Sequence, residues 1–496
     1  MRTRPTRTGP KRTGPKRTGP TRLRSGPAAA VTLLAACAVL AGCSSVGPAA
    51  RSAPSSGTSS RPAAPPSSAA GSPSAPAAAS ADWPAYHANA ARTGTVAGLP
   101  AAGPLSLAWT RPLGAAVYGQ PLVIGGTVIA ATESNQVYGL SRATGRIVWR
   151  TRIGTGAPVP LSAQPCGNID PLGITGTPVY DPATGLVYAV AELNGAVMML
   201  AGIRVTDGRL VLSRRIPAPD HEQAYDQQRG ALALADGRIY VTFGGHFGDC
   251  GPYRGSVAAV PAAGDGPILS YVIPTRAQAG IWAPGGPVVG PDGTIYVASG
   301  NGAARRPPFD GSDSVIALTP QLRRAGVFAP GRWAQDNADD LDLGSMSPAL
   351  LPGGQILQVG KSGTGYLLRA RALGGVGGQL ASAPVCAAFG GAAVTAAAVY
   401  VPCYPGGLTA VSVAGDRIRV LWRGPPTASG SPAVGGGAVW VADWNAGVLY
   451  ELGESAGRIR QRIALGSALP HFVSPTLSGG LILVGTLSGV VAVSGA

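Results

Sequence analysis

Five side chains in the middle of the sequence are of types that could together hold a polar ligand. They are Arg229, His246, Asp249, Tyr253 and Trp282, and they fall in glycine-rich stretches between apolar segments. Loops on a rigid scaffold commonly supply binding residues, so these side chains could line one mouth of a channel. The competing interpretation makes His246 and Arg229 hydrogen-bonding residues that only stabilise the loops. The residue types alone are compatible with both.

Three other kinds of site chemistry are not predicted. The histidines do not have the spacing of zinc ligands, because they are scattered along the chain. They are His87, His221, His246 and His471. The sequence also contains neither a serine in a nucleophile-elbow pattern nor a glycine loop of the phosphate-binding kind.

Four cysteines follow the N-terminal region, and in an exported chain four thiols allow three pairings. Cys386 and Cys403 flank one predicted hairpin, whereas Cys166 and Cys250 both lie in long loops. We therefore expect disulfides between Cys386 and Cys403 and between Cys166 and Cys250. The alternative is that some are buried free thiols, since cysteine packs well as a small apolar residue.

The elements that must position these residues come from a recurring five-residue phrase. It consists of a glycine, any residue, a β-branched residue, a large apolar residue and usually valine. Eight copies begin at Gly126, Gly185, Gly237, Gly293, Gly354, Ala397, Gly437 and Gly480. A short segment that often contains proline precedes each copy and two further strand-like segments follow it, so each period of roughly 40 to 60 residues holds four short strands, as a propeller blade does.

Ring closure explains a strand that lies outside these periods. The eighth copy leads only to a third strand at 490–493, while residues 105–109 form an orphan strand ahead of the first blade. A closed ring buries the faces of all blades and leaves no exposed end. The sequence therefore predicts an all-β fold: an eight-bladed β-propeller of four-stranded antiparallel blades, the last closed by an N-terminal strand.

One stretch of the chain points to a known repeat family. Residues 138–149 resemble the tryptophan-docking phrase of the quinoprotein (PQQ-like) repeat family, with Gly145 and Trp149 at the positions that define the phrase. The resemblance implies that such a fourth-strand tryptophan stacks across the interface between blades. Trp109 in the orphan strand and Trp422 in a weaker copy are the equivalent candidates. The repeats are also similar to the propeller lipoprotein of the barrel-assembly machine.

The same resemblance implies an enzymatic alternative. In quinoprotein dehydrogenases, pyrroloquinoline quinone (PQQ) and calcium occupy the axis, and the matching positions here are Glu192 and Asn301 for the cation and Asp310 or Asp313 for the catalytic base. The sequence contains neither an adjacent cysteine pair nor a Cys-x-x-Cys-His haem motif. Asn-Gly and Asp-Gly at strand ends are also ordinary turn residues. We therefore expect no cofactor, with PQQ and calcium as the alternative.

The charge of the chain is concentrated at its N-terminus. The formal net charge is +16, but nine of the basic residues lie within the first 24 positions, where there is no acidic residue. The rest of the chain has 30 basic and 23 acidic residues, and no basic stripe is interleaved with aromatics. Binding to nucleic acid is therefore not predicted.

An apolar run at residues 28–41 follows the basic arm and is too short to span a bilayer. It ends in a sequence that resembles a bacterial lipobox with Cys43 as the lipidated residue; Cys37 is a weaker candidate, and an ordinary signal peptide or an uncleaved anchor is the alternative. Residues 43–81 are almost entirely Ser, Pro, Ala and Gly. We expect a signal peptide over 1–42, a disordered tether over 43–81 and the propeller over 82–496.

These features predict a monomeric, non-catalytic lipoprotein on the outer face of the cell membrane. Its ring surface would be presented to an envelope protein or polymer. The alternatives are the PQQ- and calcium-dependent dehydrogenase and a carbohydrate-binding propeller, for which Trp282 and Trp444 are candidate stacking platforms.

Overall fold

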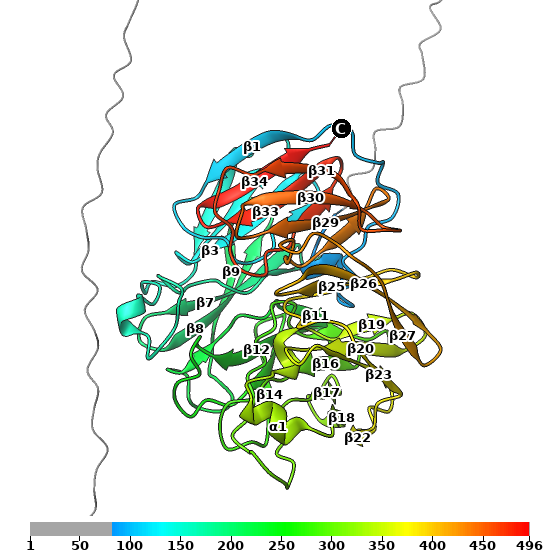
Figure 1. The fold of residues 1–496 in the computed structure, drawn as a ribbon. Helices are drawn as coiled ribbons and strands as arrows, with labels where there is room; N and C mark the ends of the chain where they lie inside the picture. The colour runs from blue at the N-terminus through cyan, green and yellow to red at the C-terminus, as the bar shows by residue number, and fades with distance from the viewer. Residues whose placement is uncertain (1–81, 496) are drawn as a thin grey trace, which may run out of the picture. The chain divides into compact units, whose positions relative to one another are not determined.

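The computed structural model describes residues 82–495, which form eight antiparallel sheets (Figure 1). The sheets follow one another in chain order around an axis, so the predicted eight-bladed β-propeller is confirmed. The predicted signal peptide, the tether and Cys43 lie outside the described residues.

The blades are numbered in chain order. Blade 1 has β2 (Leu122–Ile124), β3 (Thr127–Thr132), β4 (Gln136–Ser141) and β5 (Ile147–Arg152); blade 2 has β6 (Val179–Asp181), β7 (Leu186–Leu193), β8 (Val197–Arg204) and β9 (Leu210–Ile216). Blade 3 has β10 (Asp226–Gln227), β11 (Ala233–Ala235), β12 (Arg238–Gly245), β13 (Ser256–Pro261) and β14 (Leu269–Val272); blade 4 has β15 (Val288–Val289), β16 (Ile295–Ala298), β17 (Val315–Leu318), β18 (Arg324–Ala329) and β22 (Gly375–Val376). Blade 5 has β19 (Ala349–Leu351), β20 (Gln355–Val359), β21 (Thr364–Arg369) and β23 (Ala381–Pro384); blade 6 has β24 (Ala393–Val394), β25 (Val399–Cys403), β26 (Gly407–Ala414) and β27 (Arg417–Arg423). Blade 7 has β28 (Ala433–Gly435), β29 (Ala438–Asp443), β30 (Val448–Gly453) and β31 (Ile459–Ala464); blade 8 has β32 (Thr476–Ser478), β33 (Leu481–Thr486), β34 (Gly489–Ser494) and β1 (Ser106–Pro112). The helical turns are η1 (Tyr86–Ala88), η2 (Leu161–Ala163), α1 (Trp333–Ala338) and η3 (Leu343–Ser345).

The recurring phrase forms the second strand of every blade. Every residue of β7 and of β29 is buried. A sheet packed between two neighbouring sheets buries both faces, and so its inner strands are continuous apolar runs rather than alternating ones.

The ring closes as the orphan strand predicted. β1 pairs antiparallel with β34, from Ser106 opposite Ser494 to Pro112 opposite Gly489. Figure 1 shows β1 beside the red β34, so strands from opposite ends of the propeller complete one blade.

Two blades depart from the predicted four strands. In blade 3, β10 and β11 both pair with β12. In blade 4, β22 adds in parallel to the outer edge of β18, through the pairs Phe328 with Gly375 and Ala329 with Val376. β22 belongs to the connection between β21 and β23 of blade 5, which is long enough to reach back to the neighbouring blade.

Three tryptophans lie against a glycine of the next blade. The pairs are Trp109 with Gly145, Trp149 with Gly208, and Trp422 with Gly457. Each glycine has φ between +63° and +74°, and a Cβ there would come within 2.7 Å of the indole ring. Each indole Nε1 also donates a hydrogen bond of 2.8 or 2.9 Å to the carbonyl three residues before that glycine. Glycine is required at these positions both by the backbone and by the ring.

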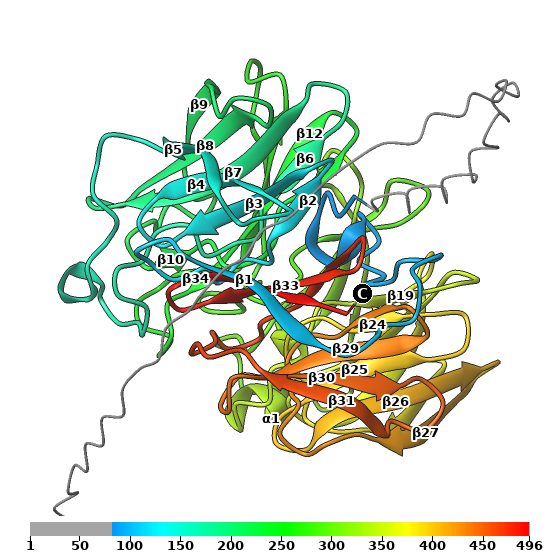
Figure 2. The same cartoon turned by 90° about the horizontal axis from the view of Figure 1, so that it is seen from above.

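A segment that carries no repeat phrase occupies the axis of the ring. Residues 83–96 form backbone hydrogen bonds with the first strands of five blades: they pair with Val123, Tyr180, Val289, Val394 and Val434. The segment is dark blue in Figure 2, inside the ring of sheets. Its Arg92 side chain, 4% exposed, donates to the carbonyls of Tyr86, Leu232 and Pro287. We call residues 83–96 the plug, since they fill the interior that the first strands enclose.

Within residues 82–495, no helix has the length and apolar character needed to cross a membrane.

Candidate functional site

One face of the ring carries the long connections, and we call it the loop face. In an antiparallel blade, the connection from the second to the third strand emerges at the same end as the connection from the fourth strand to the next blade. Long connections of these two kinds are residues 153–178, 217–232, 246–255, 273–287, 299–314 and 330–348, the second of which contains the short strand β10. The opposite end has mostly short turns, such as the one at Gly125 and Gly126. All five candidate binding residues therefore lie at the loop face.

Both predicted disulfides are present and tie loops on this face together. Cys166 and Cys250 have their Cα atoms 6.1 Å apart and join the loops 153–178 and 246–255. Cys386 and Cys403 have Cα atoms 5.7 Å apart and join the entrance of blade 6 to the end of its second strand. The alternative of buried free thiols is wrong for these four residues.

Aromatic side chains gather around Phe472 at the loop face. The group comprises Trp282, Phe389, Tyr404, Trp444, His471 and Phe472, which we call the axial cluster. The Phe472 ring centroid lies 5.8 to 6.3 Å from those of Trp282, Phe389 and Trp444. Phe472 has φ of 64°, a costly conformation for a bulky residue. Strain of this kind persists only where the surrounding packing imposes it, and it is common at binding sites.

Two cations approach the axial cluster. The Arg229 guanidinium carbon lies 5.1 Å from the centre of the Phe472 ring, and Lys361 Nζ lies 6.0 Å from the centre of the Trp282 ring. Both distances are within cation–π range. Lys361 also pairs with Asp342 at 2.6 Å, whereas Arg229 Nε is buried with no hydrogen-bond partner. Burial lowers the pKa of Arg229.

The axial cluster meets the plug with almost no space between them. A cavity of only about 10 Å³ separates them. It is lined by Phe472 and Arg229 on one side and by Tyr86 and Gln120 on the other. One water molecule needs about that volume. The axis is therefore closed on the loop-face side of the plug.

A quinone cofactor does not fit this arrangement. The ring face of Trp282 is approached by Phe472 and Lys361, and the cavity beyond is far too small for a tricyclic quinone. The residues matched to the cation are partly engaged by other groups: Glu192 Oε1 accepts the Gln228 N–H at 2.7 Å, and Asn301 Nδ2 donates to Asp340 at 2.7 Å. Asn301 Oδ1 is buried without a hydrogen-bond partner. Within the described chain, acidic, histidine and cysteine side chains form no group of three that could hold a metal ion.

The two aspartates matched to the base also bond to neighbouring loops. Asp313 Oδ1 accepts the Leu343 N–H at 2.9 Å, and Asp310 accepts hydrogen bonds from Thr275 and Ser312. Burial is the main cause that holds the pKa of Asp313 well above its usual range. Both side chains therefore order the loops around 299–314 in this structure.

The structure divides the five candidate binding residues among three places. Arg229 and Trp282 adjoin Phe472 at the axis. His246 lines a separate pocket at blade 2. Tyr253 donates a hydrogen bond of 2.5 Å to Asp249, and the two form a local pair within their loop.

Sequence reasoning missed most of the axial cluster. Tyr404 and Trp444 directly follow the second strands of blades 6 and 7, a position that the repeat pattern identifies. Trp444, for which the sequence leaves a stacking platform and a core position equally open, is 6% exposed, whereas Tyr404 is 46% exposed. No local signal marks Phe472, because its role depends on loops from several blades meeting at the axis.

Three buried carboxyl groups lie close together in blades 1 to 3. Burial is the main cause that raises the pKa of Glu133 to about 7, that of Glu192 to about 8 and that of Asp226 to about 10. The charge of Glu133 also raises the pKa of Glu192, while Asp220 and Glu192 raise that of Asp226. These raised pKa values keep Glu192 and Asp226 protonated at pH 7.

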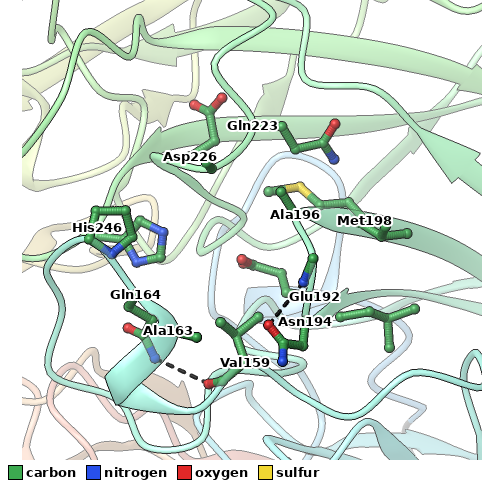
Figure 3. Close-up of a pocket in the computed structure, with 15 residues that line it drawn as sticks. Val159, Ala163, Gln164, Glu192, Asn194, Ala196, Met198, Gln223, Asp226 and His246 are labelled. Atoms are coloured by element: carbon green, nitrogen blue, oxygen red, sulfur yellow. Dashed lines mark hydrogen bonds between the residues drawn. The ribbon is translucent and has the colours of Figure 1, made fainter.

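Next to these groups lies the blade-2 pocket, lined by loops around residues 159–165, 192–198, 223–226 and 246 (Figure 3). The volume of this pocket is about 240 Å³. Disulfide Cys166–Cys250 joins two of the loops that line it. This is a space of small-molecule size, distinct from the closed axis.

Part of the chain is similar in sequence to a known protein family. Residues 90–320 match the profile of a PQQ-repeat family described as outer membrane protein assembly factor BamB. No curated protein matches the chain by sequence.

Solved structures with the same architecture include both enzymes and a BamB protein. The quinohemoprotein alcohol dehydrogenase of Comamonas testosteroni is similar with a TM-score of 0.64 and 15% identity, over 83% of this chain and 80% of that one. A europium-containing methanol dehydrogenase is similar with a TM-score of 0.63 and 14% identity, over 84% of this chain and 98% of that one. BamB from Moraxella catarrhalis is similar with a TM-score of 0.55 and 15% identity, over 79% of this chain and 100% of that one. Identities this low show a shared fold and not a shared activity. Together with the eight blades, these matches show that the chain is a β-propeller and that its residues 90–320 are similar to the PQQ-like repeat family.

Proposed function

We propose that this chain is a non-catalytic, extracytoplasmic binding propeller whose loop face receives an envelope protein or polymer. The observation that carries the proposal is the narrow axis: Phe472, Arg229 and Tyr86 of the plug leave a cavity of only about 10 Å³ between them. What the ring then offers is a rigid surface with a central aromatic patch.

The composition of that patch favours recognition of a partner. Aromatic and arginine side chains are enriched where binding energy concentrates in interfaces. Tyr404 is 46% exposed at the axis, and Phe247, in the loop that holds Cys250, is 69% exposed. The likeness to a family described as an outer membrane protein assembly factor agrees with a role in binding another envelope component.

We also propose that Cys43 carries a lipid anchor and that residues 43–81 tether the propeller to the outer face of the membrane. The support is the lipobox-like sequence and the Ser/Pro/Ala/Gly composition that follows it. Cys43→Ser should release the protein from the membrane fraction, whereas Cys37→Ser should leave it there. Membrane retention of Cys43→Ser would contradict the anchor and leave the binding proposal intact.

Site-specific photocrosslinking in intact cells tests the binding proposal directly. A photoreactive residue at Tyr404 on the loop face is compared with one at Leu421 on the outer strand β27, which is 53% exposed. The expected result is a discrete crosslinked product from position 404 and none from position 421. Equal crosslinking at the two positions, or none at 404, would argue against a loop-face partner.

The dehydrogenase alternative predicts a different result. Adding PQQ with calcium should leave the thermal midpoint of the purified protein unchanged, because a ligand that does not bind the folded state cannot stabilise it. A saturable rise that disappears in the Glu192→Ala/Asn301→Ala double variant would replace our proposal with the enzymatic one.

A further inference from the structure

The blade-2 pocket contains two polar side chains that are buried yet have hydrogen-bonding capacity to spare. Glu192 is 4% exposed, and only its Oε1 atom accepts a hydrogen bond, from the Gln228 N–H. His246 is 5% exposed, and no hydrogen bond joins its ring nitrogens to another residue in the described part of the chain. Both line the same pocket, as Figure 3 shows. Both side chains can therefore offer their remaining polar atoms to a ligand in the pocket.

The rest of the pocket wall is largely apolar. Leu193 and Met198 are buried, and Val159 and Ala163 complete the wall on the side of the 153–178 loop. A cavity of about 150 Å³ can hold benzene. The pocket, at about 240 Å³, has room for a ring or short chain that also carries one polar group.

The carboxyl groups around the pocket favour a cation over an anion. Burial and the neighbouring carboxyl groups raise the pKa of Glu192 to about 8 and that of Asp226 to about 10, so both are protonated at pH 7 while the pocket holds no opposite charge. No lysine or arginine lines the pocket, and burial lowers the pKa of His246, which keeps its imidazole neutral at pH 7. The nearby cation is Arg229, which interacts with Glu133 rather than lining the pocket. A cation in the pocket would stabilise the ionised form of Glu192, so its binding would be coupled to release of the Glu192 proton.

We propose that the blade-2 pocket binds a small organic amine, whose protonated nitrogen meets Glu192 and His246 and whose apolar part lies against Leu193 and Met198. This goes beyond the proposed function, because it adds a small-molecule site that the partner-binding face does not require. An organic cation is favoured over a metal ion because, among the residues that the structure describes, acidic, histidine and cysteine side chains form no group of three that could hold a metal ion.

Three probes of one shape and different charge test the class of ligand. Benzylamine is protonated at pH 7, benzyl alcohol is neutral and benzoate is an anion. In calorimetric titration of the full chain, we expect saturable binding of benzylamine with an affinity about tenfold or more above that of benzyl alcohol. Benzoate should not bind.

Two variants locate the binding. Glu192→Gln keeps the size and the hydrogen-bond acceptor but removes the ionisable group, and it should lose benzylamine binding. Ala163→Phe places a ring into the pocket from an exposed turn and should lose it without disturbing the core, which guards against a folding defect in the first variant. Glu451→Gln, in an equally buried glutamate of blade 7, is the matched control and should bind as the wild type does.

The proposal is overturned if the three probes bind equally, if benzylamine does not bind, or if its binding survives both Glu192→Gln and Ala163→Phe. None of these results bears on crosslinking at Tyr404, so the two proposals can fail separately.

Discussion

The contact between a tryptophan and a glycine of the next blade is the smallest unit that joins the blades. At Gly208 the Trp149 ring lies 2.7 Å from where a Cβ would be, and Trp149 Nε1 donates to the Val205 carbonyl. At Gly185 the backbone has almost the same φ, +71° against +74°, but nothing lies within 4 Å. The two glycines therefore separate the backbone requirement from the packing requirement.

Gly208→Ala should destabilise the protein more than Gly185→Ala. Both substitutions should lower the free energy of unfolding by roughly 1–2 kcal/mol, because alanine disfavours the left-handed backbone. Only Gly208→Ala adds a clash with Trp149, so it should lower the free energy of unfolding by about 1–3 kcal/mol more than Gly185→Ala does. Denaturant unfolding monitored by fluorescence measures the difference, and equal losses would mean that the indole contact contributes no stability.

Asp226 should make the stability of the folded protein fall as pH rises. Its pKa is raised to about 10, first by burial and then by Asp220, so the folded state keeps a proton that the unfolded chain releases near pH 4. The stabilising contribution is complete below pH 4 and is lost progressively toward pH 10.

Asp226→Asn is neutral at every pH and should flatten the decline of the thermal midpoint between pH 5 and pH 9. Asp443→Asn is the control, since Asp443 is equally buried but accepts backbone hydrogen bonds from Asn445 and Ala446. A decline in Asp226→Asn as steep as in the wild type would show that other groups cause it.

At the scale of elements, the loop face depends on covalent ties that the strands do not provide. Disulfide Cys166–Cys250 spans 84 residues and Cys386–Cys403 spans 17. The first one holds two loops of different blades beside the blade-2 pocket, and the second closes a local segment. Loop closure restricts the unfolded chain more when the loop is longer.

Replacing Cys166 and Cys250 by serine should therefore reduce the free energy of unfolding more than replacing Cys386 and Cys403. The chain-entropy difference between the two loop lengths is about 1.4 kcal/mol. The first variant should also weaken benzylamine binding, while the second should not. Equal losses of stability would indicate that strain or residual structure, rather than loop length, sets the effect.

At the scale of the whole molecule, the plug and β1 close the ring from the inside and the outside. The plug links the first strands of five blades through backbone hydrogen bonds. Arg92 has no acidic partner among the described residues and is held by three carbonyl groups, so it acts as a hydrogen-bonding centre rather than as half of an ion pair.

Arg92→Leu should destabilise the propeller by roughly 3 kcal/mol or more, because it leaves three buried carbonyls without a donor. Arg150→Leu, at an exposed position of β5, should change stability by less than about 0.5 kcal/mol. Calorimetric unfolding checks both. A small effect of Arg92→Leu would show that water replaces the guanidinium and that the plug is not essential to closure.

The blades were predictable because their signals are local. A turn glycine followed by β-branched and large apolar residues specifies a strand within five residues, and the orphan strand around Trp109 followed from counting strands. The plug carries no such phrase, and β22 is a two-residue strand whose partner lies in another blade. Neither has a periodic pattern, so neither could be read from the sequence.

The candidate site was only partly predictable for the same reason. Arg229, His246 and Trp282 were found from residue type, but their separation into an axial cluster and a blade-2 pocket depends on where the loops converge. The raised pKa values of Glu133 and Asp226 follow from burial and mutual charge, which no sequence spacing records.

By itself the sequence determined the eight blades, their closure and the pairing of the cysteines, because turn formation and alternation of small and apolar residues act over short distances. The tertiary structure alone decided that residues 83–96 fill the axis, that Phe472 closes it and that Glu192 and His246 share a pocket. Those outcomes depend on burial and contact between residues up to several hundred positions apart, and only the closed ring brings such residues together.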